Sequence, residues 1–292
     1  MLAAVAVGAG AGTSSAEVIN LPWTELLPPL PTSNNPQPGP VPNCRVAKPK
    51  CVQVTIDRLR LLRNRLGCDH RAVFATTYLE LTKQIREDMR TGLVRREMID
   101  PKYLYTEDGV FANFYFRVVR AWNRGEPIPE AWRIAFEAAE SQDKGAVQDM
   151  LLGINAHVQN DMPFVLASMG LRTKAGRSRK PDHDSTNGTL NRGYPRVVAA
   201  VRKRFDPAMD ISNSPLIPFD DLAGLELTRM WREVVWRNAE RLVNADSRAE
   251  RTQVAQSIEE YAALNARLIA AAGLPDYGAT RDAYCAAGPS GG

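Results

Sequence analysis

Apolar residues recur at intervals of three and four along most of the chain after residue 51. Val52, Ile56 and Leu59 show this spacing in its clearest form, with Arg and Asp residues between them. Such spacing places the apolar side chains on one face of an α-helix, whereas no segment keeps the strict alternation of a half-buried strand. The pattern therefore predicts an all-α fold, with seven to nine helices in a single globular domain.

Prolines, glycines and polar runs delimit the individual helices. Pro129 has a fixed φ that suits a first helical turn, and Pro163 is expected to end or kink the helix before it. We expect helices over residues 52–67, 73–85, 109–122, 129–141, 144–161, 164–169, 190–205, 222–244 and 247–272. The polar stretch over residues 182–187 is expected to form a loop ahead of the helix at 190.

Two segments precede the helical region. Residues 1–16 are small and apolar and end in Ser-Ser-Ala, which indicates the remnant of a signal peptide, although the usual basic region is missing. Residues 17–50 carry eight prolines between Pro28 and Pro49 and are expected to form an extended arm. The helical domain is assigned to residues 51–285, followed by a flexible tail over 286–292. No later apolar run approaches the ~20 residues that a transmembrane helix needs.

The four cysteines favour an exported protein. Cysteines without a metal-type spacing are typical of disulfides formed in an oxidising compartment. Four cysteines allow three pairings, of which we favour Cys44 with Cys51 and Cys68 with Cys285. The alternative is four unrelated thiols. Together with the apolar start of the chain, the cysteines predict a secreted or cell-envelope protein.

The apolar helix expected over residues 144–161 contains a polar group. His157 and Asp161 are four residues apart, so their side chains share a helical face and could bind one metal ion from a rigid element. Asn155 and Asn160 lie beside them and are candidate binding residues. The same side chains could instead form a buried hydrogen-bond network, because buried polar groups need partners with or without a metal. The sequence leaves both interpretations open.

A second polar group occupies residues 182–187. His183 would add a third metal ligand, Asp184 or Asp182 a fourth ligand or a general base, and Asn187 a binding residue. One divalent ion, with zinc favoured, would then activate water for hydrolysis. The sequence has no Gly-x-Ser-x-Gly, phosphate-binding Gly-rich loop or His-Glu-x-x-His, so the common hydrolase and nucleotide-binding signatures do not identify a reaction.

The helix expected over residues 222–244 holds a further candidate site. Arg232, Glu233 and Trp236 could line one wall of a pocket, although amphipathic helices commonly bury Trp and expose Arg and Glu. The net charge is +4, and basic residues are dense over 172–180 and 192–204. They could attract an anionic small-molecule or lipid-like substrate, or could simply form a solvated loop and helix face. The lack of interleaved aromatic residues does not favour nucleic acid.

Four segments of the chain carry a family resemblance: residues 74–82, 153–167, 182–187 and 231–242. Together they resemble an uncharacterised family of helical domains found mainly in actinobacteria, over most of residues 52–272. Its hallmark, Asn-Ala-His-x-x-x-Asp-x-Pro, is present here from Asn155 to Pro163. The family has no established activity, so the resemblance implies a fold and the place of a site rather than a reaction.

A fainter similarity is to the helical zinc-dependent phospholipase C and P1-type nuclease group. The resemblance would imply a His-x-x-x-Asp helix in a metal cluster. Three histidines are too few for three zinc ions, so at most one or two ions could be held.

Two functional hypotheses follow. The first is an exported metal-dependent hydrolase of phosphoester, lipid or ester substrates that uses His157, Asp161 and His183. The second is a secreted binding or structural domain in which the same residues form a buried network. Replacing His157 with Ala would remove metal and activity under the first hypothesis. Under the second it would cost about 1–3 kcal/mol of stability without a catalytic effect.

Overall fold

The computed structural model describes residues 50–209, 221–272 and 277–288. Over these residues the chain is helical with no β-strand, and an isolated bridge joins Arg172 to Ser178. The all-α prediction is confirmed. The expected signal remnant and most of the expected arm lie outside the described residues, as does Cys44. The pairing of Cys44 with Cys51 therefore stays a prediction.

The helices between Lys50 and Ile154 follow one another through connections of a few residues. The first are α2 (Lys50–Leu66), α3 (Arg71–Arg90), α4 (Leu93–Glu97), α5 (Pro101–Asn123) and α6 (Glu130–Ser141). A continuous segment comes next, formed by α7 (Ala146–Ile154), the π-helix η1 (Asn155–Asp161) and α8 (Met162–Met169). The last are α9 (Lys180–Arg204), α10 (Asp221–Asn244), α11 (Arg248–Ala271) and α12 (Tyr277–Ala287).

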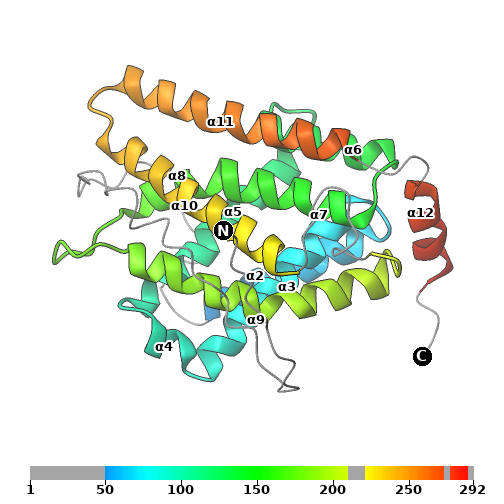
Figure 1. The fold of residues 1–292 in the computed structure, drawn as a ribbon, viewed down its shortest axis with the longest axis horizontal. Helices are drawn as coiled ribbons and strands as arrows, with labels where there is room; N and C mark the ends of the chain where they lie inside the picture. The colour runs from blue at the N-terminus through cyan, green and yellow to red at the C-terminus, as the bar shows by residue number, and fades with distance from the viewer. Residues whose placement is uncertain (1–49, 210–220, 273–276, 289–292) are drawn as a thin grey trace, which may run out of the picture.

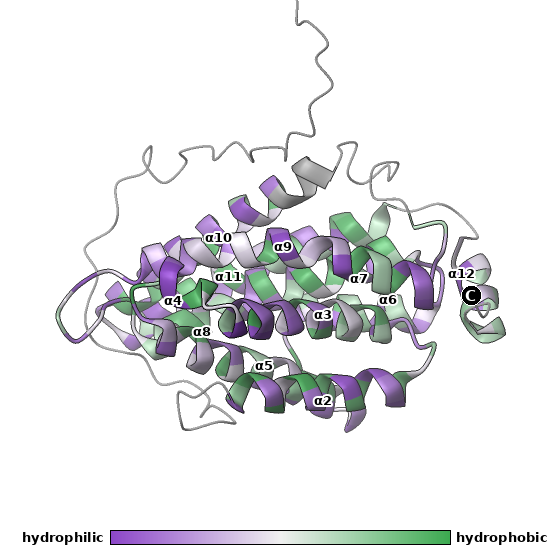
Figure 2. Cartoon of the chain, turned by 90° about the horizontal axis from the view of Figure 1, so that it is seen from below, coloured by the Kyte–Doolittle hydropathy of each residue, from purple (hydrophilic) through white to green (hydrophobic). Residues whose placement is uncertain are grey.

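The segment from α7 to α8 lies at the centre of the bundle. Helix η1 contacts α5, α6, α10 and α11, and α3 packs against α2, α7 and α9 (Figure 1). Helix α2, for example, buries Val52, Ile56 and Leu59 and packs against α3 and α5. Figure 2 shows the mixture of hydrophilic and hydrophobic residues along this helix, at one edge of the bundle. The polar residues of η1 are therefore surrounded by protein on several sides.

The expected loop over residues 182–187 is helical, so that prediction is wrong. Helix α9 begins at Lys180, with Pro181 in its first turn and Asp182 beside the helix N-terminus. Proline is pre-organised for a first helical turn, and a carboxylate there interacts favourably with the helix dipole. The loop was predicted because polar residues are dense here, and the helix-start signals of Pro181 and Asp182 were not weighed against that density. His183 and Thr186 consequently project from a rigid helix.

Helix α5 also begins earlier than predicted, at Pro101 and not near Gly109. Pro101 occupies the first helical position after Asp100. The longer helix brings Glu107 and Asp108 into the protein interior, where both are buried. Neither residue was among the candidate site residues.

The C-terminal helix α12 is attached to the body by a disulfide. Cys68 and Cys285 are bonded across 217 residues of sequence, with their Cα atoms 5.8 Å apart, which confirms the predicted pairing. His70 supports the attachment, because its ring contacts Asp149 at 2.7 Å and Asp282 of α12 at 3.1 Å. The helix was not predicted, and it extends into the expected flexible tail as far as Ala287.

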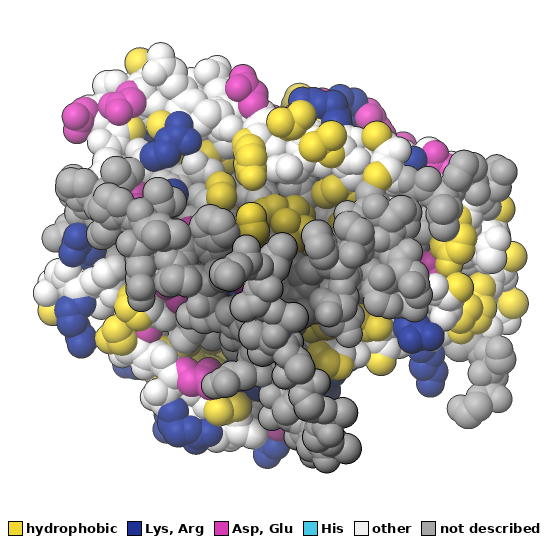
Figure 3. All heavy atoms as spheres, in the orientation of Figure 1, with side chains coloured by type: hydrophobic (Ala, Val, Ile, Leu, Met, Phe, Trp, Pro, Cys, Tyr) yellow, Lys and Arg dark blue, Asp and Glu magenta, His cyan; other side chains and the backbone are white. Residues whose placement is uncertain are grey.

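Several large apolar side chains of α11 remain at the surface. Tyr261, Leu264 and Leu268 are 39%, 51% and 61% exposed, and Figure 3 shows hydrophobic side chains at the surface over this helix.

None of the helices in the described ranges combines the length and the hydropathy needed to cross a bilayer.

Candidate functional site

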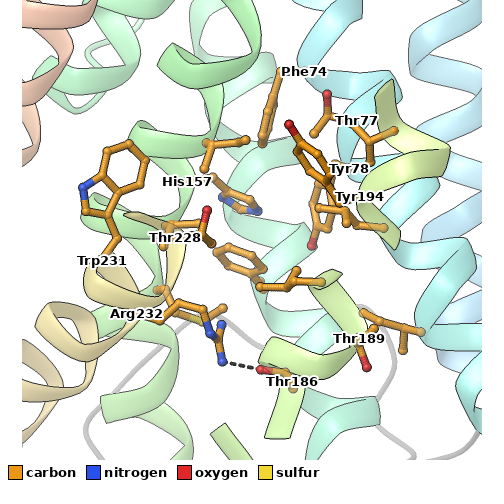
Figure 4. Close-up of a pocket in the computed structure, with 18 of the residues that line it drawn as sticks. Phe74, Thr77, Tyr78, His157, Thr186, Thr189, Tyr194, Thr228, Trp231 and Arg232 are labelled. Carbon is orange, nitrogen blue, oxygen red and sulfur yellow. Dashed lines mark hydrogen bonds between the residues drawn. The ribbon is translucent and has the colours of Figure 1, made fainter. Parts of the chain in front are cut away.

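A cavity of about 170 Å³ lies between α3, α5, α9, α10 and the α7–α8 segment. Most of the lining side chains are apolar, but His157, Thr186 and Arg232 also reach the wall. Figure 4 shows Arg232 and Thr186 together in one part of the cavity wall, and His157 beside Tyr78 in another. An apolar cavity of about 150 Å³ in another protein takes up benzene. The cavity is thus large enough for a small apolar molecule.

The π-helical turn positions His157 in this wall. The Met162 N–H bonds to the His157 carbonyl, five residues earlier, and Pro163 then has no N–H to donate. π-Helical turns are rare and occur frequently at functional sites. Before the turn, Gly153 lies against the ring of Phe74, and a Cβ atom at this position would collide with that ring. The glycine therefore allows the segment to approach α3 closely.

Asp161 holds His157 in place. Its carboxylate is buried and accepts hydrogen bonds from Trp132 Nε1 at 2.9 Å, His157 Nδ1 at 2.9 Å and Asn160 Nδ2 at 2.8 Å. A buried carboxylate is costly unless such donors replace its water. The structure thus brings His157, Asn160 and Asp161 together. Trp132 and Asn160 hold the carboxylate of Asp161 in place, and this carboxylate orients the imidazole of His157.

The remaining surroundings of His157 are aromatic. Its ring stacks on Phe111 with 3.5 Å between centroids and 5° between planes, and Tyr78 packs at 5.0 Å. Burial lowers the pKa of His157, although the hydrogen bond with Asp161 acts in the opposite direction. A neutral ring that donates from Nδ1 has an acceptor at Nε2. Nε2 is buried and has no hydrogen-bond partner within the described part of the chain.

Two acidic residues of α5 also border the cavity. Burial raises the pKa of Glu107 to about 7, while the charge of Arg232 acts to lower it. Burial likewise raises the pKa of Asp108 to about 7. The Oε2 atom of Glu107 is buried without a hydrogen-bond partner among the residues that the structure describes. Near neutral pH each carboxyl can be either a hydrogen-bond donor or an acceptor.

Arg232 of α10 brings a buried positive charge to the cavity. Its side chain is anchored to α9: Nε donates to Asn187 Oδ1 at 2.7 Å, and Nη2 donates to the His183 carbonyl and to Thr186 Oγ1. Burial lowers the pKa of Arg232, and the charge of Glu107 acts to raise it. Arg232 and Asn187, both predicted from sequence as binding residues, are therefore in direct contact.

His183 is fully engaged with the same arginine. Its Nδ1 lies 3.2 Å from Arg232 Nη2, and its Nε2 lies 3.1 Å from the Arg232 carbonyl oxygen. Nε2 therefore donates and Nδ1 accepts, which is the neutral form of the ring. Burial and the charge of Arg232 hold the pKa of His183 well below its usual range. The histidine is part of the contact between α9 and α10.

The two aspartates proposed as catalytic residues make structural contacts. Asp182 accepts hydrogen bonds from the backbone N–H groups of Ile99 at 2.5 Å and Asp100 at 3.0 Å, at the start of α5. Asp184 forms an ion pair with Lys180 at 2.9 Å. Their carboxylates thus stabilise the start of α5 and the first turns of α9.

Three other predicted binding residues also take part in packing. Glu233 pairs with Lys180 at 2.7 Å, and the buried Trp236 donates from Nε1 to Glu240 at 2.9 Å. Asn155 donates to the Ala262 carbonyl at 2.8 Å and so ties η1 to α11. These contacts hold the helices around the cavity.

The three expected metal ligands do not fit a shared ion in this arrangement. His157 Nδ1 is bonded to Asp161, and both ring nitrogens of His183 are engaged with Arg232. Within the ranges that the structure describes, no group of three or more His, Cys, Asp or Glu side chains is placed to hold a metal. The metal-dependent hydrolase stays a prediction that these contacts do not support.

Residues 52–272 match the model of a family of unknown function, DUF5995, so the chain belongs to that family. The match covers the helices that form the cavity and includes the π-helical turn. The expectation of an uncharacterised helical family is confirmed. Searches of curated proteins and of solved structures found no match.

The sequence prediction missed Glu107, Asp108 and the contribution of Trp132. Pro101, a helix-start signal, would have placed the two acids inside α5. The bond from Trp132 to Asp161 joins α6 to η1 across 29 residues of sequence, so no local pattern reveals it.

Proposed function

We propose that this domain binds a small apolar molecule that carries a hydrogen-bond donor. The observation that supports the proposal most strongly is the combination of a mainly apolar cavity of about 170 Å³ with a lining histidine, His157, whose Nε2 is buried and unpaired within the described part of the chain. Ligand sites are commonly apolar cavities with a few placed polar groups that fix the orientation of the ligand.

The imidazole has the features of a binding group. It is neutral, and its contacts with Asp161 and Phe111 hold the ring in one orientation before a ligand arrives. A hydroxyl or amine group of the ligand would donate to Nε2. Leaving a buried acceptor unpaired costs about 1–3 kcal/mol, which a donor from the ligand would recover.

We also propose that the protein acts outside the cytoplasm, as a secreted or cell-envelope protein. The Cys68–Cys285 disulfide supports this location, because disulfides persist mainly in oxidising compartments. Purification of the protein from culture medium, followed by mass measurement with and without reductant, tests the location. Recovery only from the cytoplasm with reduced cysteines would contradict it.

A pair of matched substitutions tests the binding function. Val158→Phe adds a ring to the cavity wall, whereas Val147→Phe adds the same ring to a half-buried position of α7 outside the cavity lining. We expect 1-hexanol to cause saturable changes in the NMR spectra of the wild type and of Val147→Phe, but not of Val158→Phe. No saturable change in the wild type, or equal binding by both variants, would contradict the proposal.

A further inference from the structure

The charge balance of the cavity wall suggests what kind of head group the ligand carries. Arg232 is 5% exposed and lines the cavity. Its hydrogen bonds, to Asn187, Thr186 and His183, all go to uncharged groups. A buried guanidinium is costly unless an anion compensates its charge. Among the described residues, no carboxylate lies within ion-pair distance of Arg232.

The guanidinium also retains donors for a ligand. Nε and Nη2 make its hydrogen bonds, whereas Nη1 makes none to the residues that the structure describes. Arginine has five N–H donors in a planar fork that matches the two oxygens of a carboxylate. Figure 4 shows the guanidinium extended toward Thr186, held by the bond between them. Arg232 is therefore anchored on one side and has donor capacity left.

Among the acidic groups that raise the pKa of Arg232, Glu107 has the largest effect and Asp184 the next, and Glu107 also lines the cavity. The interaction is electrostatic, and burial keeps the pKa of Glu107 near neutrality, at about 7. A protonated Glu107 does not repel an anion and can donate a hydrogen bond to it, whereas an ionised Glu107 opposes the anion. The other charged or titratable groups that act on Glu107 or border it are Arg179, Asp182, Asp108, Tyr78 and Tyr103.

We infer that the ligand carries a carboxylate in addition to its hydrogen-bond donor, so that it is a small apolar hydroxy acid. Its carboxylate binds Arg232, its hydroxyl donates to His157 Nε2, and its hydrocarbon part occupies the apolar cavity. This inference rests on the proposed binding function and specifies its ligand class. The size of the cavity suits a chain or ring of about six carbons, by comparison with the cavity that takes up benzene. Glu107 and Asp184 act on the charge of Arg232 without forming an ion pair, and the bond between carboxylate and guanidinium would supply that direct pair.

A matched pair of probes tests the inference on the full-length protein. Hexanoate and 1-hexanol share a six-carbon chain. Hexanoate carries only the carboxylate expected to bind Arg232, and 1-hexanol carries only the hydroxyl expected to donate to His157. NMR titration at pH 6.5 should give a Kd for hexanoate about tenfold lower than for 1-hexanol, which is the usual advantage of a hydrogen bond to a charged group. Binding of 1-hexanol with no preference for hexanoate would overturn the inference and leave the proposed function intact. Binding of neither probe would overturn both.

Variants trace the preference to Arg232. Arg232→Gln should abolish the preference for hexanoate over 1-hexanol, and Arg232→Lys should retain part of it.

Because Arg232 also joins α9 to α10, these variants can fail to fold, so Glu107→Gln supplies a second test that leaves Arg232 in place. At pH 8 it should raise the ratio of hexanoate to 1-hexanol affinity several-fold, since an ionised group near the anion is removed. An unchanged ratio in Glu107→Gln, or an undiminished preference in folded Arg232→Gln, would overturn the inference.

Discussion

His157 and His183 are both buried, and the sequence indicated both as metal ligands, yet their roles in the structure differ. His183 has both ring nitrogens engaged with Arg232, and so completes a contact between two helices. His157 borders the cavity, and its ring has one nitrogen held by Asp161 and the other buried without a hydrogen-bond partner among the described residues. The comparison teaches that a buried histidine becomes a candidate for binding when its partners leave one nitrogen available.

The largest effect is expected from removal of the carboxylate that orients His157. Asp161→Ala would leave the buried donors of Trp132, His157 and Asn160 without their acceptor, so we expect the free energy of unfolding to fall by about 3–5 kcal/mol. Urea denaturation measures the change. Asp184→Ala is the matched control, because its half-exposed pair with Lys180 should contribute less than about 1 kcal/mol. Equal losses of stability in the two variants would show that the buried hydrogen bonds of Asp161 contribute no more than the half-exposed ion pair of Asp184.

His183→Phe tests the structural role of the other histidine. The variant removes the acceptor of Arg232 Nη2 and the donor to the Arg232 carbonyl. We expect a loss of about 2–3 kcal/mol in the free energy of unfolding, because hydrogen bonds to charged groups are worth more than neutral ones. A change below about 0.5 kcal/mol by urea denaturation would show that this contact is dispensable.

Glu107→Gln is expected to stabilise the protein above neutral pH. The pKa of Glu107 is raised from 4.5 to about 7, so the folded state holds a proton that the unfolded state releases first. The wild-type contribution is therefore most favourable below pH 4.5 and is lost as the pH rises through 7. At pH 8 the variant should gain on the order of 2 kcal/mol relative to its effect at pH 4. A pH-independent difference between variant and wild type would contradict this assignment.

His157→Phe should have the smallest effect on stability and a clear effect on binding. Phenylalanine preserves the aromatic contact with Phe111 but leaves Asp161 with one donor fewer. Because the substitution also removes the unpaired buried Nε2, we expect a net loss of about 1 kcal/mol. Binding of 1-hexanol should weaken about tenfold, because the acceptor for its hydroxyl is gone. Undiminished binding in a folded variant would remove His157 from the site.

The two histidines also make an expected contribution to the acid sensitivity of the fold. The pKa values of His157 and His183 are both lowered, so the unfolded state takes up protons first as the pH falls. Their contribution to stability is complete above the unfolded pKa of about 6.5 and declines as the pH falls below it. His183→Phe should flatten this decline between pH 7 and pH 5 in urea denaturation. An unchanged decline would show that other groups cause it.

Local patterns allowed much of the fold to be predicted. The periodicity placed most helices, and the spacing of His157 and Asp161 placed their side chains on one face, where they form a hydrogen bond. The pairing of Cys68 with Cys285 was predicted as well. The helices and the hydrogen bond depend on residues that are close in sequence. The disulfide could be predicted because four cysteines allow only three pairings.

The candidate site itself could be predicted only in part, because tertiary contacts decide the state of each group. The sequence indicated His183 as a metal ligand, but the neighbouring Arg232 lies 49 residues away and occupies both ring nitrogens. It did not indicate Glu107, whose raised pKa results from burial by surrounding helices. A cavity has no signature in a local pattern, since its wall is assembled from several helices.

The most direct test of the central claim observes the ring nitrogens of His157 by ¹⁵N NMR during titration with 1-hexanol. We predict that free His157 at pH 7 carries its proton on Nδ1 and has an unprotonated Nε2, whose resonance shifts saturably as the hydroxyl binds. A protonated Nε2 in the free protein, or an Nε2 resonance that does not respond while 1-hexanol binds, would contradict the account.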